Sequence, residues 1–222
     1  MPDIGSSPRV AFFIDGFNLY HSVKAAEHLL CNKALKWLDV HALCESYLHQ
    51  IGGHARLTQI HYFTAFAEHL REKIPEKVAR HKAFIRALTS RKTQIHLGKF
   101  TKKKVWSQEL ERWVSVYEEK ETDVAIACKV LAMDNELDVA VIMTGDSDFA
   151  PVAKTYQERF PSKRILFALP FARATKRLRQ LCPESFTISK EAYMKHPLPH
   201  RVKLPSGKFV TIPATWQNEV QI

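Results

Sequence analysis

The stretch Val10-Ala11-Phe12-Phe13-Ile14-Asp15-Gly16-Phe17-Asn18 decides the fold, because a continuous apolar run stops abruptly at an Asp-Gly pair. Such a run predicts a short strand that is covered on both faces, as in a parallel sheet. From Phe17 to about Leu30 apolar residues recur at helical spacing, so the chain passes directly from strand to helix. Asp15 therefore marks the carboxyl end of a central strand, where open α/β sheets bind their ligands.

The rest of the chain repeats this alternation. Further strands are predicted over residues 57–66, 93–97, 139–143 and 165–169, and helices over 39–48, 75–88, 123–133, 151–160 and 172–182. This order predicts an α/β fold, a three-layer α/β/α sandwich with a mainly parallel central sheet. Residues 99–118 interrupt the alternation as a basic excursion with the pattern of a hairpin.

A chain of 222 residues fits one domain with an appendage. We expect the domain to cover residues 9–188. Residues 189–222 form a proline-rich C-terminal extension without helical periodicity, and we expect it to be extended or a small hairpin.

Charge and cysteine content narrow the class of protein. Lys and Arg total 33 against 23 for Asp and Glu, a net charge of +10, which favours a polyanionic partner. The cysteines at positions 31, 44, 128 and 182 form no CxxC pair, and neither a signal peptide nor a long apolar segment is visible. These features predict a cytoplasmic protein with reduced thiols and no membrane partner. They leave open whether the protein is a homodimer.

Four aspartates lie where a predicted strand ends or a predicted helix begins, and these positions suggest that they share one site. Asp15 follows the first strand, Asp146 and Asp148 follow the strand over 139–143, and Asp123 begins a helix. Carboxylates that converge repel one another unless a cation lies between them, so the cluster predicts a divalent metal such as Mg²⁺. The alternative interpretation for each is helix capping, for which Asp is a favoured residue. Asn18, one helical turn beyond Asp15, is a candidate to orient it or to contact a phosphate.

The three aspartate motifs resemble those of the NYN domain family, PIN-like ribonucleases related to FLAP-type nucleases, and in particular its bacterial LabA-like branch. The matching segments are Phe13-Ile14-Asp15-Gly16-Phe17-Asn18, Lys120-Glu121-Thr122-Asp123 and Thr144-Gly145-Asp146-Ser147-Asp148-Phe149. The resemblance covers roughly residues 9–188. At Glu121 the chain departs from the family, which often has Gly there.

The resemblance implies a Mg²⁺- or Mn²⁺-dependent endoribonuclease with a PIN-like fold. Asp15, Asp123, Asp146 and Asp148 would hold the metal, and water activated there would attack the phosphodiester in line, leaving 5′-phosphate and 3′-hydroxyl ends. Lys120 and Asn18 would contact the scissile phosphate.

Two basic segments are candidate RNA-binding rims, because cations follow a phosphate backbone while aromatic side chains stack on unpaired bases. The alternative for each is a solvated surface. The first segment contains Lys99, Lys102, Lys103, Lys104 and Trp106, and the second contains Arg173, Lys176, Arg177 and Arg179.

Two other functions fit part of the pattern. A phosphatase of the haloacid dehalogenase type also has an aspartate at a strand end, but its second catalytic aspartate would stand where this chain has Phe17. A catalytically silent RNA-binding or regulatory module of the same fold would keep the motifs without turnover. Walker-type and GxGxxG phosphate loops are absent from the sequence, so nothing in it points to ATP or NAD.

Overall fold

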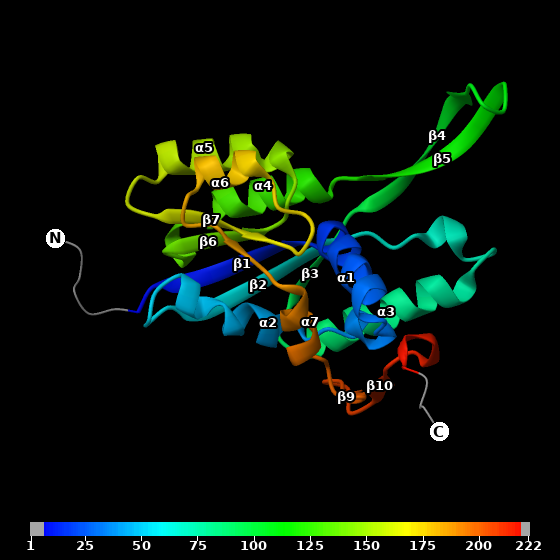
Figure 1. The fold of residues 1–222 in the computed structure, drawn as a ribbon, viewed down its shortest axis with the longest axis horizontal. Coiled ribbons are helices and arrows are strands. Elements are labelled where there is room, and N and C mark those ends of the chain that lie inside the picture. The colour runs from blue at the N-terminus through cyan, green and yellow to red at the C-terminus, as the bar shows by residue number, and fades with distance from the viewer. Residues whose placement is uncertain (1–6, 219–222) are drawn as a thin grey trace.

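In the computed structural model, which describes residues 7–218, the main sheet has six strands in the order β3-β2-β1-β6-β7-β8 (Figure 1). Every neighbouring pair in it is parallel. The strands are β1 (Arg9–Asp15), β2 (Arg56–Thr64), β3 (Gln94–Leu97), β6 (Val139–Met143), β7 (Arg164–Leu169) and β8 (Phe186–Thr187). The predicted α/β class with a parallel central sheet is confirmed.

Helices cover both faces of this sheet, with α4, α5 and α6 on one side and α1, α2, α3 and α7 on the other (Figure 1). Their bounds are α1 (Gly16–Leu30), α2 (Val40–Ser46), α3 (Pro75–Ser90), α4 (Thr122–Ala132), α5 (Ala150–Arg159), α6 (Lys176–Leu181) and α7 (Lys190–Lys195). Short 3-10 turns lie at η1 (Lys33–Lys36), η2 (Leu48–Gln50), η3 (Glu68–Leu70), η4 (Asp134–Glu136), η5 (Ser147–Phe149) and η6 (Ala214–Trp216).

Side chains of β1 alternate between two hydrophobic cores because successive residues of a strand point to opposite faces. Phe12 packs into the core between the sheet and helices α1 and α3, whereas Phe13 packs into the core between the sheet and helices α4 and α5. The apolar run that opens the sequence is therefore buried on both sides, and the three-layer arrangement follows from it.

Strand order places a topological switch point between β1 and β6. The chain after β1 builds the sheet outward through β2 and β3, while the chain after β6 builds it in the opposite direction through β7 and β8. Loops leaving two such strands diverge, and the crevice between their carboxyl ends is where doubly wound sheets bind ligands. Asp15 ends β1, and Thr144 directly follows β6.

Local signals account for most of the helix boundaries. Asp39, the first residue of the helix predicted over 39–48, caps α2, since its carboxylate accepts a hydrogen bond of 3.1 Å from the backbone N–H of Ala42. The helix predicted over 172–182 is wrong in its first turn, because α6 begins only at Lys176. Ala172 has a left-handed backbone with φ of 58°, and the Arg173 N–H closes a turn onto the Pro170 carbonyl.

The basic excursion is an antiparallel hairpin of β4 (Lys99–Ser107) and β5 (Arg112–Lys120) that projects away from the body (Figure 1). Its root packs on the domain through aromatic rings. Phe100 lies edge-on to Phe17 with ring centroids 5.8 Å apart, and Tyr117 stacks on His69 at 3.9 Å.

Beyond α7 the chain forms a small hairpin of β9 (Arg201–Lys203) and β10 (Phe209–Thr211), followed by η6. Trp216 from η6 packs against Trp37 and Phe84, with ring centroids 6.4 and 6.3 Å away. Residues 219–222, at the end of the predicted extension, lie outside the described residues. The same is true of residues 1–6, where a signal peptide would begin. Of the helices within residues 7–218, none combines the length and apolar character needed to cross a bilayer.

Candidate functional site

Asp15 is the buried centre of the candidate site. Its side chain is 7 % exposed, and both carboxylate oxygens accept hydrogen bonds. The backbone N–H of Asn18 donates to Oδ1 at 2.9 Å, which caps α1, and the Thr144 hydroxyl donates to Oδ2 at 2.9 Å. Burial raises the pKa of Asp15 above its ordinary value, and the charges of Asp146 and Glu119 raise it further, against the effect of the two hydrogen bonds.

The loop after β6 is fixed to the start of α1 by hydrogen bonds. The Gly145 N–H donates to the side-chain oxygen of Asn18 at 3.0 Å, so Asn18 connects the two motifs. The Thr144 hydroxyl oxygen accepts from the Asp146 N–H at 3.1 Å, and Asp146 Oδ1 accepts from the Asp148 N–H at 2.9 Å. Asp146 rather than Asp148 therefore caps the 3-10 turn η5.

Gly145 is required where it stands because the segment after β7 passes directly over it. A Cβ atom placed on Gly145 would lie 1.8 Å from the carbonyl oxygen of Arg173. The absence of a side chain at this position brings Arg173, predicted as part of a basic rim, against the loop that carries Asp146 and Asp148.

Asp123 approaches the same place from the start of α4. Its pKa is raised from 3.8 to about 6, first by desolvation and then by the charges of Asp15, Glu119, Asp146 and Asp148. Although its side chain lies at the surface, Asp123 thus shares a negative field with carboxylates from two other segments. The structure brings all the predicted acidic residues to one end of the sheet.

Glu121 and Lys120 point elsewhere. Glu121 has a left-handed backbone with φ of 84° and pairs with Lys99, so its side chain is engaged at the hairpin root. The Lys120 ammonium pairs with Glu118 at 3.0 Å.

Register in the hairpin divides the candidate RNA-binding residues between two faces. Trp106 pairs with Trp113, Lys102 with Tyr117 and Phe100 with Glu119, so these side chains, together with Lys104, share one face. Lys103 pairs with Val116 and lies on the opposite face, with Lys99 and Lys120. In the second rim, Lys176, Arg177 and Arg179 lie at the surface of α6.

Two residues near the site lie outside the predicted set. Thr144 is fully buried and hydrogen-bonds both Asp15 and the backbone of Asp146. Glu119 lies at the start of α4, where its Oε1 accepts from the backbone N–H of Thr122 at 3.2 Å and from the Thr122 hydroxyl at 2.6 Å. The alternation of Trp113, Ser115 and Tyr117 along β5 extends to Glu119, and this periodicity was the signal in the sequence that could have found it.

The donor set suits a hard cation, because every side chain at its centre offers carboxylate oxygens. Within residues 7–218, however, no group of three or more His, Cys, Asp or Glu side chains is placed so that it could hold a metal ion. Mg²⁺ usually keeps several water ligands and is bound through one or two carboxylates, so fewer than three direct ligands from this set would be sufficient for such an ion.

Comparison with known protein families identifies the family of this chain. The sequence profile described as the NYN domain matches residues 9–190. The chain belongs to the NYN domain family. Its fold is thereby that of the PIN-like nucleases, and a role in RNA metabolism is typical of the family. The match does not distinguish branches of the family, so assignment of this NYN protein to the LabA-like branch stays a prediction.

The fold of this NYN protein is also similar to a crystal structure of a protein of unknown function from Vibrio parahaemolyticus. The two share 13 % sequence identity with a TM-score of 0.52, over 84 % of this chain and 97 % of the other. At that identity the likeness concerns the fold alone. A comparison with curated proteins finds no match.

Proposed function

We propose that this NYN protein is a metal-dependent endoribonuclease that hydrolyses RNA phosphodiester bonds at the carboxylate site. The observation that carries the proposal is the approach of several carboxylates to Asp123, whose pKa is raised to about 6 first by burial and then by the negative charges of Asp15, Glu119, Asp146 and Asp148. Such repulsion costs folding free energy unless a cation occupies the site. The excess of Lys and Arg over Asp and Glu, a net charge of +10, suits a polyanionic substrate.

Asp15, Asp123, Asp146 and Asp148 are the proposed ligands of Mg²⁺ or Mn²⁺. Each carboxylate oxygen has two lone pairs, so the hydrogen bonds on Asp15 leave capacity for a ligand bond. A divalent ion held there would supply activation of water and neutralisation of charge on the phosphate and the leaving oxygen.

The remaining site residues position the substrate. Asn18 uses its side-chain oxygen on Gly145, so its amide N–H groups are the donors available to a phosphate oxygen. Lys120 is proposed to contact the same phosphate, and doing so requires it to leave Glu118. Arg173, which lies over the Asp146 loop, would hold an adjacent phosphate, and Lys176 and Arg177 would extend that track along α6.

The hairpin face that carries Glu119 leads outward from the carboxylates. Lys102, Lys104 and Trp106 lie along it, and Trp106 and Trp113 at its far end are 52 % and 65 % exposed. Exposed aromatic rings between cations are suited to single-stranded RNA, whose bases can stack while the backbone meets positive charge. We propose that this face guides the strand to the site and that Lys103, on the other face, contributes only to the general positive field.

The test is cleavage of labelled single-stranded RNA, hairpin RNA and matching DNA by purified protein in Mg²⁺, Mn²⁺ and EDTA. We expect RNA to be cut internally in either metal, with 5′-phosphate ends, and to remain intact in EDTA. Asp146→Asn should retain folding and RNA binding but lose cleavage. RNA binding without cutting by the wild type in either metal would identify the RNA-binding module instead.

A further inference from the structure

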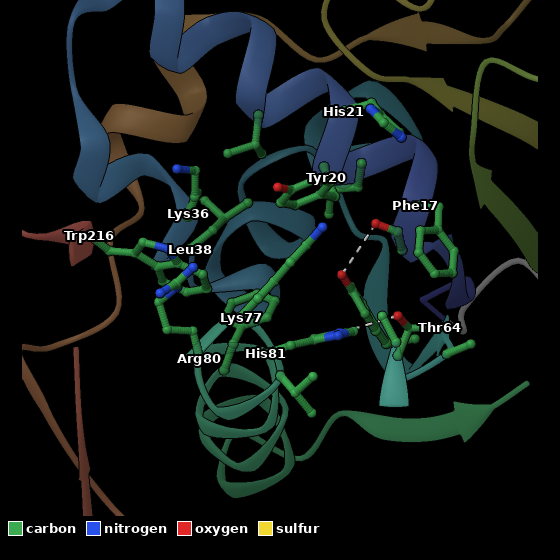
Figure 2. Close-up of a pocket in the computed structure, with 18 of the residues that line it drawn as sticks. Phe17, Tyr20, His21, Lys36, Leu38, Thr64, Lys77, Arg80, His81 and Trp216 are labelled. Atoms are coloured by element: carbon green, nitrogen blue, oxygen red, sulfur yellow. Dashed lines mark hydrogen bonds between the residues drawn. The ribbon is translucent and has the colours of Figure 1, made fainter. Parts of the chain in front are cut away.

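A cavity of about 340 Å³ lies between α1 and α3 (Figure 2). We call it the α1–α3 cavity. Aromatic residues of three separate parts of the chain, Tyr20, Phe100 and Trp216, contribute to its wall. A concave and mostly apolar space with a few polar groups is typical of a small-ligand site. Its apolar lining comes from Leu19, Val23, Leu38, Val78 and Phe84.

The α1–α3 cavity and the carboxylate site share the start of α1. Gly16 and Phe17 line the cavity and directly follow Asp15 in the chain. Phe100, at the root of the hairpin, lines it as well and contacts Phe17. If a phosphate of an RNA strand lies at Asp15, the adjoining nucleotide of that strand can therefore reach the cavity.

Positive charge gathers at this cavity without a matching negative charge. Lys77 and Arg80 extend from α3 into it, as Figure 2 shows. Among residues 7–218, neither of them pairs with a carboxylate, whereas Lys36 is paired with Glu27 at 2.8 Å. Burial lowers the pKa of His81 to about 4, so its ring is neutral near pH 7 and serves as a hydrogen-bonding group. An anionic ligand would complete the charge balance.

We propose that the α1–α3 cavity binds one nucleotide of the RNA strand next to the phosphodiester at the carboxylates. Its base would lie against Tyr20 and the neighbouring aromatic wall, and its phosphate would meet Lys77 and Arg80. The volume of 340 Å³ is near the lower end of small-ligand cavities, about 300–1,000 Å³, which suits a single nucleotide. This assignment rests on the proposed function, since it takes RNA as the substrate.

The test is binding of a short fluorescent single-stranded RNA in EDTA, which removes any contribution from a metal ion. Arg80→Glu should weaken binding by about tenfold, because a phosphate contact becomes a repulsion. Arg86→Glu is the matched control, since Arg86 lies on the same helix at the surface and does not line the cavity; it should change affinity by less than about twofold. Equal affinities of the two variants, both folded by circular dichroism, would overturn the assignment.

A second pair of variants tests the aromatic wall. Tyr20 is 39 % exposed, so Tyr20→Ala should leave the core intact while weakening RNA binding by about fivefold or more. Tyr20→Phe keeps the ring and should restore the affinity. Loss of affinity in both variants alike would show that the ring is not what binds the base.

A free nucleotide has the same chemistry as a nucleotide within a strand, so adenosine 5′-monophosphate serves as the second probe. If Arg80→Glu weakens binding of this nucleotide but not of RNA, the cavity is a free-nucleotide site and the proposal fails. The binding readout is independent of turnover. Cleavage that persists in Arg80→Glu with unchanged RNA affinity would refute the cavity assignment alone, whereas failure of the wild type to cut RNA would refute the proposed function.

Discussion

The Thr144 hydroxyl donates a hydrogen bond of 2.9 Å to Oδ2 of Asp15 and thereby joins the carboxyl ends of β6 and β1. The same hydroxyl oxygen accepts from the backbone of Asp146, so one buried side chain sets the position of two candidate metal ligands. The site is therefore built on the adjacent ends of two central strands, which are among the most rigid parts of such a fold.

Replacing Thr144 with Val should damage the site while preserving its shape. The variant leaves the buried carboxylate of Asp15 without one donor and the Asp146 N–H without its acceptor, which we expect to cost about 1–3 kcal/mol of stability. The rate of RNA cleavage should fall as well. Urea denaturation measures the loss of stability, and a cleavage assay measures the loss of activity. Thr144→Ser is the control because it keeps the hydroxyl, and equal behaviour of the Val and Ser variants would contradict the role given to this hydrogen bond.

Gly145→Ala should displace the segment that carries Arg173. The added Cβ would lie 1.8 Å from a backbone carbonyl oxygen, so the loop must move, and overpacking of this kind costs about 1–3 kcal/mol or more. We expect a lower midpoint of thermal unfolding and loss of cleavage. Gly53→Ala is the control, since nothing lies within 4 Å of a Cβ placed there. A Gly145→Ala protein as stable and active as that control would show that the close packing is unnecessary.

Asp123 should make the metal-free protein less stable as pH rises. Its pKa of about 6 in the folded state exceeds the ordinary 3.8, so the folded protein holds a proton that the unfolded chain releases between these values. The free energy of unfolding therefore declines across that window, and the full penalty is present above about pH 6. Urea denaturation in EDTA at pH 5 and pH 7 should show a smaller decline for Asp123→Asn than for the wild type.

The proton on the Asp123 carboxylate competes with a metal ion, so Mn²⁺ affinity and the rate of cleavage should increase from pH 5 to pH 7. In Asp123→Asn this increase should be reduced, because the group that titrates near pH 6 is absent. An identical pH dependence in the two proteins would exclude Asp123 as the titrating ligand.

The hairpin should bind RNA through one face only. Lys102→Gln should lower the slope of log affinity against log salt by about 0.7, the contribution of one phosphate contact to a single strand. Lys103→Gln removes the same charge from the neighbouring residue on the opposite face and should leave the slope nearly unchanged. Fluorescence anisotropy at several salt concentrations compares them. Equal slopes would indicate a diffuse positive surface instead of a directed face.

Much of the fold follows from local sequence patterns. The apolar run of β1, the alternation of strands with helices, the Asp39 cap and the hairpin were all predictable, because each depends on residues close together in the chain. The strand-end positions of Asp15 and Asp146 followed as well, since parallel strands place their carboxyl ends at one edge of the sheet.

Other features depend on tertiary contacts that the local pattern does not contain. The late start of α6 follows from the left-handed Ala172 and from the packing of Arg173 over Gly145. The nearness of Glu119 to Asp15 depends on how the hairpin leaves the sheet. The α1–α3 cavity is completed by Trp216, more than a hundred residues beyond the other elements of its wall.

The most direct test of the account follows bound metal and RNA cleavage in the same samples while Mn²⁺ is titrated at pH 7. Electron paramagnetic resonance reports the bound ion, and a labelled single-stranded RNA reports cutting. For the wild type we expect the two curves to rise together, and for Asp146→Asn we expect both to shift to higher Mn²⁺ or to disappear. Cleavage that proceeds without bound Mn²⁺, or Mn²⁺ binding that is unchanged in Asp146→Asn, would contradict the assignment of these carboxylates as a catalytic metal site.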